Sequence, residues 1–391
     1  MATPTLYPRV DLSKEEIIRY SRHLITPEVG MAGQLKLKQA RVLCIGTGGL
    51  GSAIAIYLGA AGVGKLGLVD SDVVEVSNLQ RQVLHGTSDV GRSKLDSARD
   101  TILEINPHVE LETYEARLKR ENALRILADY DVVVDGTDNL PSRYLLSDAC
   151  VLLGKPLVHG SVYRFEGQAT VFNAQHGPCY RCVYPDPPPP ELVQRIAVGG
   201  ILGVQPGIIG CIQALETIKL ILGKGKPLIG RLLVFDGLNL KFREVKLRRN
   251  PACPACGAHP TITRELMNYE EFCGIRGPAP PAPVGVSEVT APEVKKIVEE
   301  GKPCILIDLG ERQEYEAGHI PGARSIPLGE LLFHLHEFSW ADDLVVYSGR
   351  EGRSREAAAT LLSANFRKTR VLKGGFLAWA EQGRPPAAKS K

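Results

Sequence analysis

A short apolar segment that runs directly into a glycine-rich turn is the feature of this sequence that most restricts its fold. Arg41-Val-Leu-Cys-Ile45 has the length and apolar content of a buried strand, and Gly46-Thr-Gly-Gly-Leu-Gly51 follows it without a break. Residues 51–61 are typical of a helix, and segments 65–69 and 131–135 are typical of further strands. Strands that alternate with helices predict an α/β fold, with a parallel sheet covered on both faces.

Length and composition set the broad class. A chain of 391 residues is too long for one typical core, so we expect two domains. The formal net charge of +3 gives no reason to expect nucleic acid or an anionic membrane as a partner. No apolar run reaches the ~18 residues of a membrane span, and the N-terminus lacks the apolar core of a signal peptide. We therefore expect a cytoplasmic protein, in which the nine cysteines serve metal binding or catalysis before disulfides.

A proline- and glycine-rich stretch divides the chain. Residues 274–287 carry little apolar periodicity and are typical of a semi-rigid linker. The predicted domains are residues 1–273 and 288–391, and a second α/β pattern occupies the latter. At the other end, Ser13 with Glu16 has the spacing of a capping box and predicts the start of the first helix.

The glycine turn is suited to phosphate. Glycines let backbone N–H groups approach a phosphate closely, and the N-terminus of the following helix favours negative charge. Asp70, at the end of the next strand, can accept hydrogen bonds from a ribose. A nicotinamide-dependent dehydrogenase would show the same features, so this pattern alone leaves the two classes open.

Cationic and acidic residues further along separate the two classes. Arg81, Lys94 and Asp138 follow predicted strands, where α/β sheets place their ligands. Attack of a carboxylate on the α-phosphate of ATP builds negative charge on phosphoryl oxygens, which Arg, Lys and Mg²⁺ stabilise. Asp138 offers the oxygen ligand that Mg²⁺ prefers. A dehydrogenase needs none of these groups, although either cation taken singly could be a solvated surface charge.

These motifs together resemble the MoeB/ThiF family of adenylating enzymes, relatives of the ubiquitin-activating enzymes. The resemblance runs from about Ser13 to Gly274 and rests on residues 19–22, 46–51, 77–81, 91–94, 136–139 and 203–210. It implies a Rossmann-like domain that binds ATP and Mg²⁺ through Gly46, Gly48, Gly49, Asp70, Ser77, Asn78, Leu79, Gln80, Arg81, Lys94, Asp138 and Asn139. It implies catalytic roles for Arg22, Arg81, Lys94 and Asp138. Because Arg22 would reach the phosphates of the other subunit, the resemblance also implies a homodimer.

Two Cys-x₂-Cys pairs predict a metal site. Cys179, Cys182, Cys253 and Cys256 can supply four thiolates to one Zn²⁺, in a closed structural site with no open position for catalysis. A redox pair or an iron–sulfur centre is the alternative, and the family resemblance favours zinc. The other five cysteines lie mostly in apolar contexts and are expected to be buried structural thiols: Cys44, Cys150, Cys211, Cys273 and Cys304.

The second domain resembles rhodanese, a persulfide-carrying sulfurtransferase module. Residues 306–308, 314–323 and 372–379 carry this match, and residues 348–354 correspond to the active loop. Ser348 occupies the position of the loop cysteine, and a hydroxyl does not become a persulfide. We therefore expect no sulfurtransferase activity, although Arg353 and the loop amides could bind an oxyanion. Gly310 also departs from the pattern, since rhodanese relatives commonly have Arg there.

A second cysteine used by many adenylating relatives is also missing. Alignment on the shared Gly-x-Leu-Gly-Val places Ile196 where those relatives carry a nucleophilic cysteine, and no cysteine lies between Cys182 and Cys211. Isoleucine cannot form a thioester or an acyl disulfide.

These observations predict an adenylyltransferase of the molybdopterin-synthase or thiamine type. Its substrate would be the C-terminal Gly-Gly carboxylate of a ubiquitin-like sulfur-carrier protein, with sulfur from a separate donor protein. The rival hypothesis is a non-catalytic dimeric scaffold for a sulfur-transfer complex. The sequence does not show whether the protein serves molybdenum-cofactor synthesis, thiamine synthesis, tRNA thiolation or cysteine synthesis.

Overall fold

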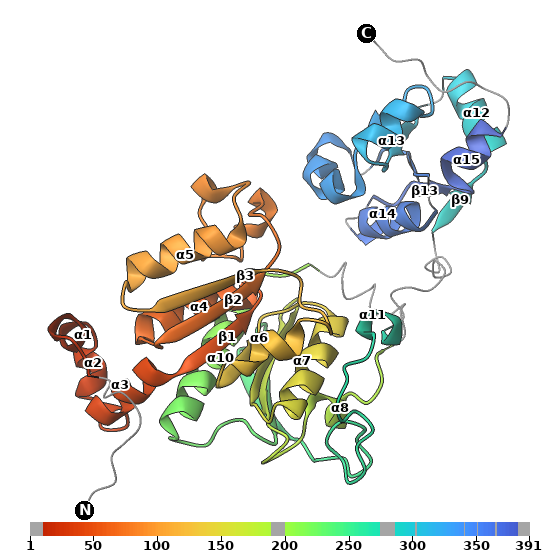
Figure 1. The fold of residues 1–391 in the computed structure, drawn as a ribbon. Coiled ribbons are helices and arrows are strands. Elements are labelled where there is room, and N and C mark those ends of the chain that lie inside the picture. Colours follow the sequence, from red (N-terminus) through yellow and green to blue (C-terminus); the bar gives the residue numbers. More distant parts are fainter. Residues whose placement is uncertain are drawn as a thin grey trace, which may run out of the picture. The chain divides into compact units, whose positions relative to one another are not determined.

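The computed structural model describes residues 11–188, 200–273, 286–301, 303–339, 341–349, 351–363 and 366–381. The described residues form two compact units, one within residues 11–273 and one within residues 286–381 (Figure 1). The linker at 274–287 stays a prediction, because residues 274–285 lie outside the described ranges; the first strand of the second unit begins at Ser287.

An eight-stranded sheet in the order β3-β2-β1-β4-β5-β6-β7-β8 organises the first unit. Its strands are β1 (Arg41–Ile45), β2 (Lys65–Asp70), β3 (Glu110–Glu115), β4 (Val132–Asp135), β5 (Leu157–Tyr163), β6 (Glu166–Phe172), β7 (Arg231–Asp236) and β8 (Lys241–Lys246). The five strands from β3 to β5 are parallel, as predicted. The antiparallel extension β6-β7-β8 was not predicted, and its edge strand β8 is exposed along its whole length.

The helices of this unit follow the predicted alternation only in part. They are α1 (Lys14–Arg19), α2 (Ser21–Leu24), α3 (Gly30–Gln39), α4 (Gly49–Ala61), α5 (Lys94–Ile105), α6 (Ala123–Ala128), α7 (Leu140–Leu152), α8 (Tyr180–Val183), α10 (Val204–Leu222) and α11 (Tyr269–Phe272), with 3₁₀ turns η1 (Val76–Asn78) and η2 (Thr87–Asp89). The capping box of α1 is confirmed: the amide N of Glu16 donates to Oγ of Ser13 over 3.2 Å, and the amide N of Ser13 donates to Oε2 of Glu16 over 2.8 Å. Helix α4 begins two residues before the expected position.

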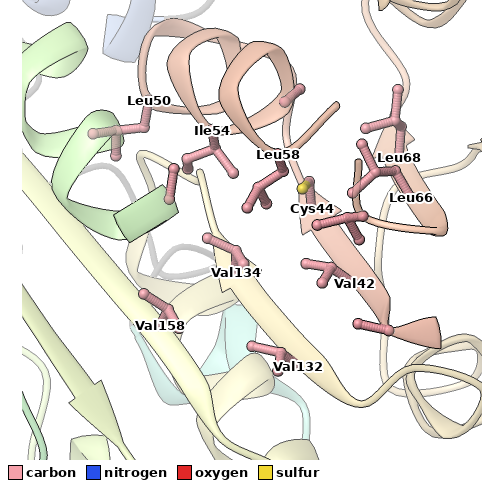
Figure 2. Close-up of a cluster of buried hydrophobic side chains, with 14 of the residues drawn as sticks. Val42, Cys44, Leu50, Ile54, Leu58, Leu66, Leu68, Val132, Val134 and Val158 are labelled. Carbon is pink, nitrogen blue, oxygen red and sulfur yellow. The ribbon is translucent and has the colours of Figure 1, made fainter. Parts of the chain in front are cut away.

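The central parallel strands β2, β1 and β4 are buried on both faces, and their successive side chains point to opposite sides of the sheet. Figure 2 shows Ile54 and Leu58 of α4 directed at Cys44 of β1, in a cluster that also includes side chains of α5 and α10. Leu43 and Val133 belong to a second cluster, with side chains of α6 and α7. Covering helices therefore fix the sheet from both sides and hold the carboxyl ends of its parallel strands in place.

The second unit is a five-stranded parallel sheet in the order β11-β10-β12-β13-β9. Its elements are β9 (Ser287–Val289), α12 (Ala291–Glu299), β10 (Ile305–Asp308), α13 (Arg312–Ala317), β11 (Arg324–Ser325), η3 (Leu328–Glu337), β12 (Leu344–Tyr347), α14 (Glu351–Ser363), β13 (Thr369–Leu372) and α15 (Gly375–Ala380). Two buried clusters cover its faces, one containing Val346 and the other Val345 of β12. Across the described ranges of both units, no helix combines the length and the apolar character that a bilayer span requires.

Candidate active site and four-cysteine cluster

The glycine turn lies against the turn that follows β4. Gly46 has a φ of +89°, which favours glycine, and a Cβ atom there would lie 3.0 Å from the carbonyl oxygen of Gly136. A Cβ on Gly51 would collide with the carbonyl oxygen of Gly46. The structure therefore brings two predicted motifs, residues 46–51 and 136–139, to one edge of the sheet.

Asp70 anchors this turn from the end of β2. Its Oδ2 accepts hydrogen bonds from the amide and the hydroxyl of Thr47, each 2.8 Å long. Its Oδ1 accepts from the amides of Ser71 and Asp72, over 2.8 and 3.0 Å. The carboxylate thus orders the glycine turn by itself, and its predicted ribose contact would use the remaining acceptor capacity of its oxygens.

The segment 77–81 runs beside the turn. Arg81 donates from Nη1 to the carbonyl oxygen of Ser77 over 3.0 Å, and its Cγ lies 3.6 Å from the place of a Cβ on Gly49. Asn78 is buried, while Gln80 is exposed and its carbonyl oxygen meets the backbone of Gly203 at the start of α10. The stem of Arg81 therefore lies beside the glycine turn, while its guanidinium is held by the backbone of its own segment.

Lys94 is the first residue of α5 and is only 5% exposed. Its Nζ contacts Oδ2 of Asp72 at 2.9 Å, and Asp72 follows Asp70 by two residues. This burial excludes the alternative that Lys94 is an ordinary solvated surface charge. A buried ammonium beside the end of β2 can stabilise phosphoryl charge.

The turn after β4 combines an exposed acid with a buried one. Asp138 is exposed, and Oδ1 of Asn139 caps α7 by accepting from the amide of Ser142 over 3.0 Å. Asp135 is fully buried and accepts from Nδ1 of His159 over 2.7 Å. It also accepts from the amide and the hydroxyl of Thr137, over 2.9 and 2.6 Å. Asp135 and His159 fix the backbone that presents Asp138, and sequence reasoning assigned a role to neither.

The charge state of the buried pair follows from its surroundings. Burial alone would raise the pKa of Asp135, but the hydrogen bonds from His159 and Thr137 and the nearby charge of Arg143 outweigh it, and the pKa lies below its ordinary value. Burial lowers the pKa of His159, although Asp135 opposes this effect. Asp135 is therefore an ionised acceptor at neutral pH, which suits its bonds from Thr137.

Arg22 stands apart from these residues. It lies in the short helix α2 and is exposed, and its carbonyl oxygen accepts from the hydroxyl of Thr26 over 2.9 Å. In the part of the chain that the structure describes, no hydrogen bond or ion pair joins Arg22 to the glycine turn or to Lys94. A role in the site of its own chain is thus without structural support, and a role in a second copy stays a prediction.

The four predicted metal ligands converge. Cys179, at the start of α8, lies 3.8 Å from Cys182, 3.5 Å from Cys253 and 3.4 Å from Cys256, sulfur to sulfur, and Cys182 lies 3.3 Å from Cys256. All four sulfurs are within 4.8 Å of one another. Sulfurs bound at ~2.3 Å in a tetrahedron stand roughly 3.8 Å apart, so this arrangement fits one Zn²⁺. Gly257 directly follows Cys256, and a Cβ atom there would collide with the backbone of Cys253.

A buried ion pair ties the cluster to α7. Arg181 lies between Cys179 and Cys182, and its side chain is 2% exposed. Its Nε and Nη2 donate to the carboxylate of Asp148 over 2.8–3.0 Å, and Tyr269 donates its hydroxyl to Asp148 over 2.7 Å. Sequence reasoning missed this pair, because nothing in the sequence distinguishes Arg181 and Asp148 from surface charges.

Of the five remaining cysteines, three are buried, one is half-buried and one is exposed. Burial raises the pKa of Cys44 to about 12 and that of Cys273 to about 11. Cys150 is also buried, and Cys304 is half-buried with its pKa raised to about 11. Cys211 is exposed, so the expectation of a buried thiol is wrong there. It lies on the side of α10 that faces away from the sheet, where an apolar residue does not signal burial.

The loop after β12 is organised around Ser348. This residue is fully buried, its hydroxyl lies 3.0 Å from that of Ser354, and its carbonyl oxygen accepts from the amide of Phe376 over 3.1 Å. Arg353 donates from Nη1 to Oε2 of Glu314 over 2.7 Å, so its charge is paired within the domain. Ile196 lies outside the described residues.

Comparison with known proteins agrees with this geometry. Residues 20–255 match the ThiF family, and residues 290–382 match the rhodanese-like domain. The probable adenylyltransferase/sulfurtransferase MoeZ of Mycobacterium tuberculosis (strain H37Rv) is 46% identical over 98% of this chain and 97% of that protein. The adenylyltransferase and sulfurtransferase MOCS3 of Mus musculus is 48% identical over 84% of this chain and 72% of that protein. The crystal structure of E. coli MccB with ATP has a TM-score of 0.55 at 22% identity, covers 61% of this chain and 74% of that chain, and supports the fold alone.

The parallel sheet and the turns at its carboxyl edge define an α/β protein of the nucleotide-binding type. The chain belongs to the ThiF family and carries a rhodanese-like domain after the ThiF region. The predicted recognition, the fold class with its four-cysteine cluster, and the adenylyltransferase function are thereby confirmed.

The expectation of no sulfurtransferase activity is wrong. MoeZ, aligned with this chain over nearly the whole of both proteins, and MOCS3 are named as sulfurtransferases as well as adenylyltransferases, and the rhodanese-like domain is matched along its length. The residue argument went too far for a physical reason. Ser348 restricts the chemistry of one side chain, and that one side chain does not decide the activity of the whole protein.

Proposed function

We propose that this protein uses ATP to adenylylate the C-terminal Gly-Gly carboxylate of a ubiquitin-like sulfur-carrier protein, and takes part in the transfer of sulfur to that carrier. The observation that carries the proposal is the meeting of the glycine turn, buried Lys94 and exposed Asp138 at one edge of the sheet. The names of MoeZ and MOCS3 support both activities.

The chemistry follows from the charges at this edge. The carrier carboxylate attacks the α-phosphate of ATP, a bond from carboxylate oxygen to phosphorus forms, and pyrophosphate leaves. The amides of the turn, with Arg81 and Lys94, would stabilise the negative charge that builds on the phosphoryl oxygens. Asp138 and Asn139 would hold Mg²⁺, which supplies further charge neutralisation when bound. Ser77, Asn78, Leu79 and Gln80 would border the nucleotide.

The four cysteines would hold one structural Zn²⁺. The sulfur spacing described above supports this assignment, and the burial of three of the four thiols leaves no open position for a substrate. The cluster joins segments 179–182 and 253–256, so the ion would fix the antiparallel end of the unit. The proposal includes a cytoplasmic setting, in which thiolates stay reduced and available to zinc.

An exposed apolar surface beside the site supports a protein substrate. Leu238, Leu240 and Phe242 are 72%, 76% and 53% exposed around the turn between β7 and β8. Gly237 in this turn meets the side chain of Gln205 at the start of α10, which in turn borders residues 77–81. Exposed apolar residues so close to a polar site favour a docking surface for the carrier.

A second copy of the chain would complete the site. Leu215 and Val204 on α10 are more than half exposed, as are Ile18 and Ile25 on the helical segments that flank Arg22. Such apolar faces support a homodimer in which Arg22 reaches the phosphates bound by the partner. The proposed partners are therefore a second copy, the carrier, and a separate protein that donates sulfur, as a sulfurtransferase requires.

The dimer proposal predicts complementation between two inactive variants. Arg22→Ala and Asp138→Ala chains, mixed under conditions that exchange subunits, should regain about a quarter of the parent activity. Random exchange makes half of the dimers mixed, and one of the two sites in each mixed dimer is intact. Pyrophosphate exchange measured before and after mixing tests this, with subunit exchange followed by differently tagged chains. No recovery despite complete exchange would place Arg22 in the site of its own chain.

Carrier-dependent exchange of labelled pyrophosphate into ATP tests the proposed function itself. The purified protein should catalyse this exchange with a carrier that ends in Gly-Gly, and a carrier shortened by the last glycine should give none. Exchange depends on formation of the acyl-adenylate, so it separates an adenylyltransferase from a scaffold. Absence of exchange with every Gly-Gly carrier tested would favour the non-catalytic scaffold.

A further inference from the structure

A buried histidine, His85, contacts both the glycine turn and α5, the two segments that the proposed phosphate site combines. His85 is 6% exposed and lies between the glycine turn and α5. Its Nε2 is 3.1 Å from the carbonyl oxygen of Thr47, and its Nδ1 is 2.9 Å from Oγ of Ser97. Neither the predicted site nor the proposed mechanism uses this residue.

The hydrogen-bond partner of Nε2 shows which ring nitrogen of His85 carries the hydrogen. A carbonyl oxygen only accepts, so Nε2 of His85 must carry a hydrogen and donate to Thr47. Burial lowers the pKa of His85, which leaves the ring neutral at neutral pH with its single hydrogen on Nε2. Ser97 has one hydroxyl hydrogen for two acceptors, Nδ1 of His85 and Oδ2 of Asp89, so the Nδ1 contact is at most a shared hydrogen bond. The ring is therefore a fixed donor to the backbone of the glycine turn.

This contact orients an amide of the turn. The peptide bond between Thr47 and Gly48 is planar and trans, so the carbonyl of Thr47 and the N–H of Gly48 point in opposite directions. Because the carbonyl is directed at His85, the N–H of Gly48 is directed away from it. Asp70 holds the other side of Thr47 through the amide and hydroxyl of that residue, at 2.8 Å each. Thr47 is thus held at its N–H, its hydroxyl and its carbonyl.

On its Nδ1 side, His85 contacts α5, the helix that begins with Lys94. Ser97 lies three residues after Lys94 on α5, close to one helical turn. Its hydroxyl oxygen is also 2.8 Å from Oδ2 of Asp89, and Asp89 is held by the amide of Gly86 over 2.9 Å. The chain of contacts therefore joins the glycine turn to the start of α5.

We propose that His85 is a positioning residue for the triphosphate of ATP. It holds the Thr47–Gly48 peptide through Nε2, so that the N–H of Gly48 faces the phosphates. This inference rests on the proposed function, since it concerns the same nucleotide site. It differs from a purely structural role for a buried histidine, because it assigns the two ring nitrogens unequal importance for ATP.

Two substitutions separate the ring nitrogens. The side-chain amide of glutamine in His85→Gln can place its nitrogen near the position of Nε2 and donate to Thr47. The shorter side chain of His85→Asn reaches only the position of Nδ1, beside Ser97. Each variant loses one of two buried contacts, so both should lower the melting temperature by a similar amount. Ser97→Ala is a third variant that keeps the Thr47 contact.

ATP affinity, measured by calorimetry on the full chain without carrier, gives the decisive comparison. His85→Asn should weaken the Kd for ATP by about 10-fold, the value of one hydrogen bond of about 1.4 kcal/mol. His85→Gln and Ser97→Ala should stay within about threefold of the parent. Carrier-dependent exchange should show the same pattern in KM for ATP, with kcat changed little.

The outcomes distinguish this inference from the proposed function. Parental affinity in His85→Asn, or equal weakening in all three variants, would overturn the positioning role even if the parent is an active adenylyltransferase. A parent that binds ATP but shows no exchange would contradict the proposed function, while the calorimetric comparison would still test His85. A parent that binds no ATP would overturn both.

Discussion

Replacement of Asp138 by alanine is expected to lower carrier-dependent pyrophosphate exchange by about 100-fold or more. The carboxylate is exposed on the turn after β4, beside the glycine turn, where Mg²⁺ and ATP phosphates are proposed to bind. Loss of the ligand that holds Mg²⁺ removes the charge that the ion supplies to the phosphoryl oxygens, and a loss of such stabilisation typically costs this much in rate. Exchange at saturating ATP and Mg²⁺ measures the effect.

The fold should be unaffected by this change, which makes the test clear. The fixed backbone of the turn depends on Asp135, His159 and Thr137, and no described hydrogen bond joins the Asp138 side chain to them. The melting temperature and the zinc content should therefore match the parent. Glu121→Ala, which removes an exposed acid from a surface pair with Arg120, should leave exchange unchanged. Exchange that survives in Asp138→Ala at the parental rate would refute the assigned role.

The sequence predicted the parts of the site that lie on the chain as continuous motifs. β1 ends where the apolar run predicted, the φ of +89° at Gly46 favours glycine, and a Cβ atom on Gly51 would collide with a backbone oxygen. These features are local: a strand, a tight turn and a helix follow one another within about twenty residues. A single sequence shows such local features directly, because the residues that form them are neighbours along the chain.

The residues that support the site were not predicted, because their partners are distant in sequence. Asp135 meets His159 across 24 residues, and His85 meets Thr47 across 38. Burial of these groups depends on the covering helices and cannot be read from their neighbours along the chain. The edge strand β8 was missed for a related reason: it is exposed along its length, so apolar alternation does not mark it.

The rhodanese-like domain shows a different limit of residue reasoning. Ser348 is correctly placed at the start of the loop after β12, and it is fully buried. The conclusion drawn from it was about an activity of the whole domain, and the names of full-length relatives contradict that conclusion. Ser348 decides what its own hydroxyl can do, and the activity of the whole domain does not follow from that one side chain.

The pair formed by Arg181 and Asp148 carries the largest stability effect that we expect. Both side chains are buried, at 2% and 0% exposure, and the guanidinium also lies over the rings of Tyr144 and Phe272, at 4.9 and 4.5 Å. Asp148→Ala would leave a buried cation without its counter-charge. Removal of one partner of such a pair costs about 3–5 kcal/mol in the free energy of unfolding, far more than the pair itself contributes.

A matched exposed pair provides the control for this last prediction. Arg41 and Asp131 lie 3.1 Å apart, but their side chains are 49% and 47% exposed, so Asp131→Ala should cost within about 1 kcal/mol. Urea unfolding of both variants gives the two free energies. Because Arg181 lies between Cys179 and Cys182, Asp148→Ala should also lose zinc faster to a chelator, whereas Asp131→Ala should keep the parental rate. Equal costs in the two variants would show that burial of the Arg181 pair does not govern the stability of this region.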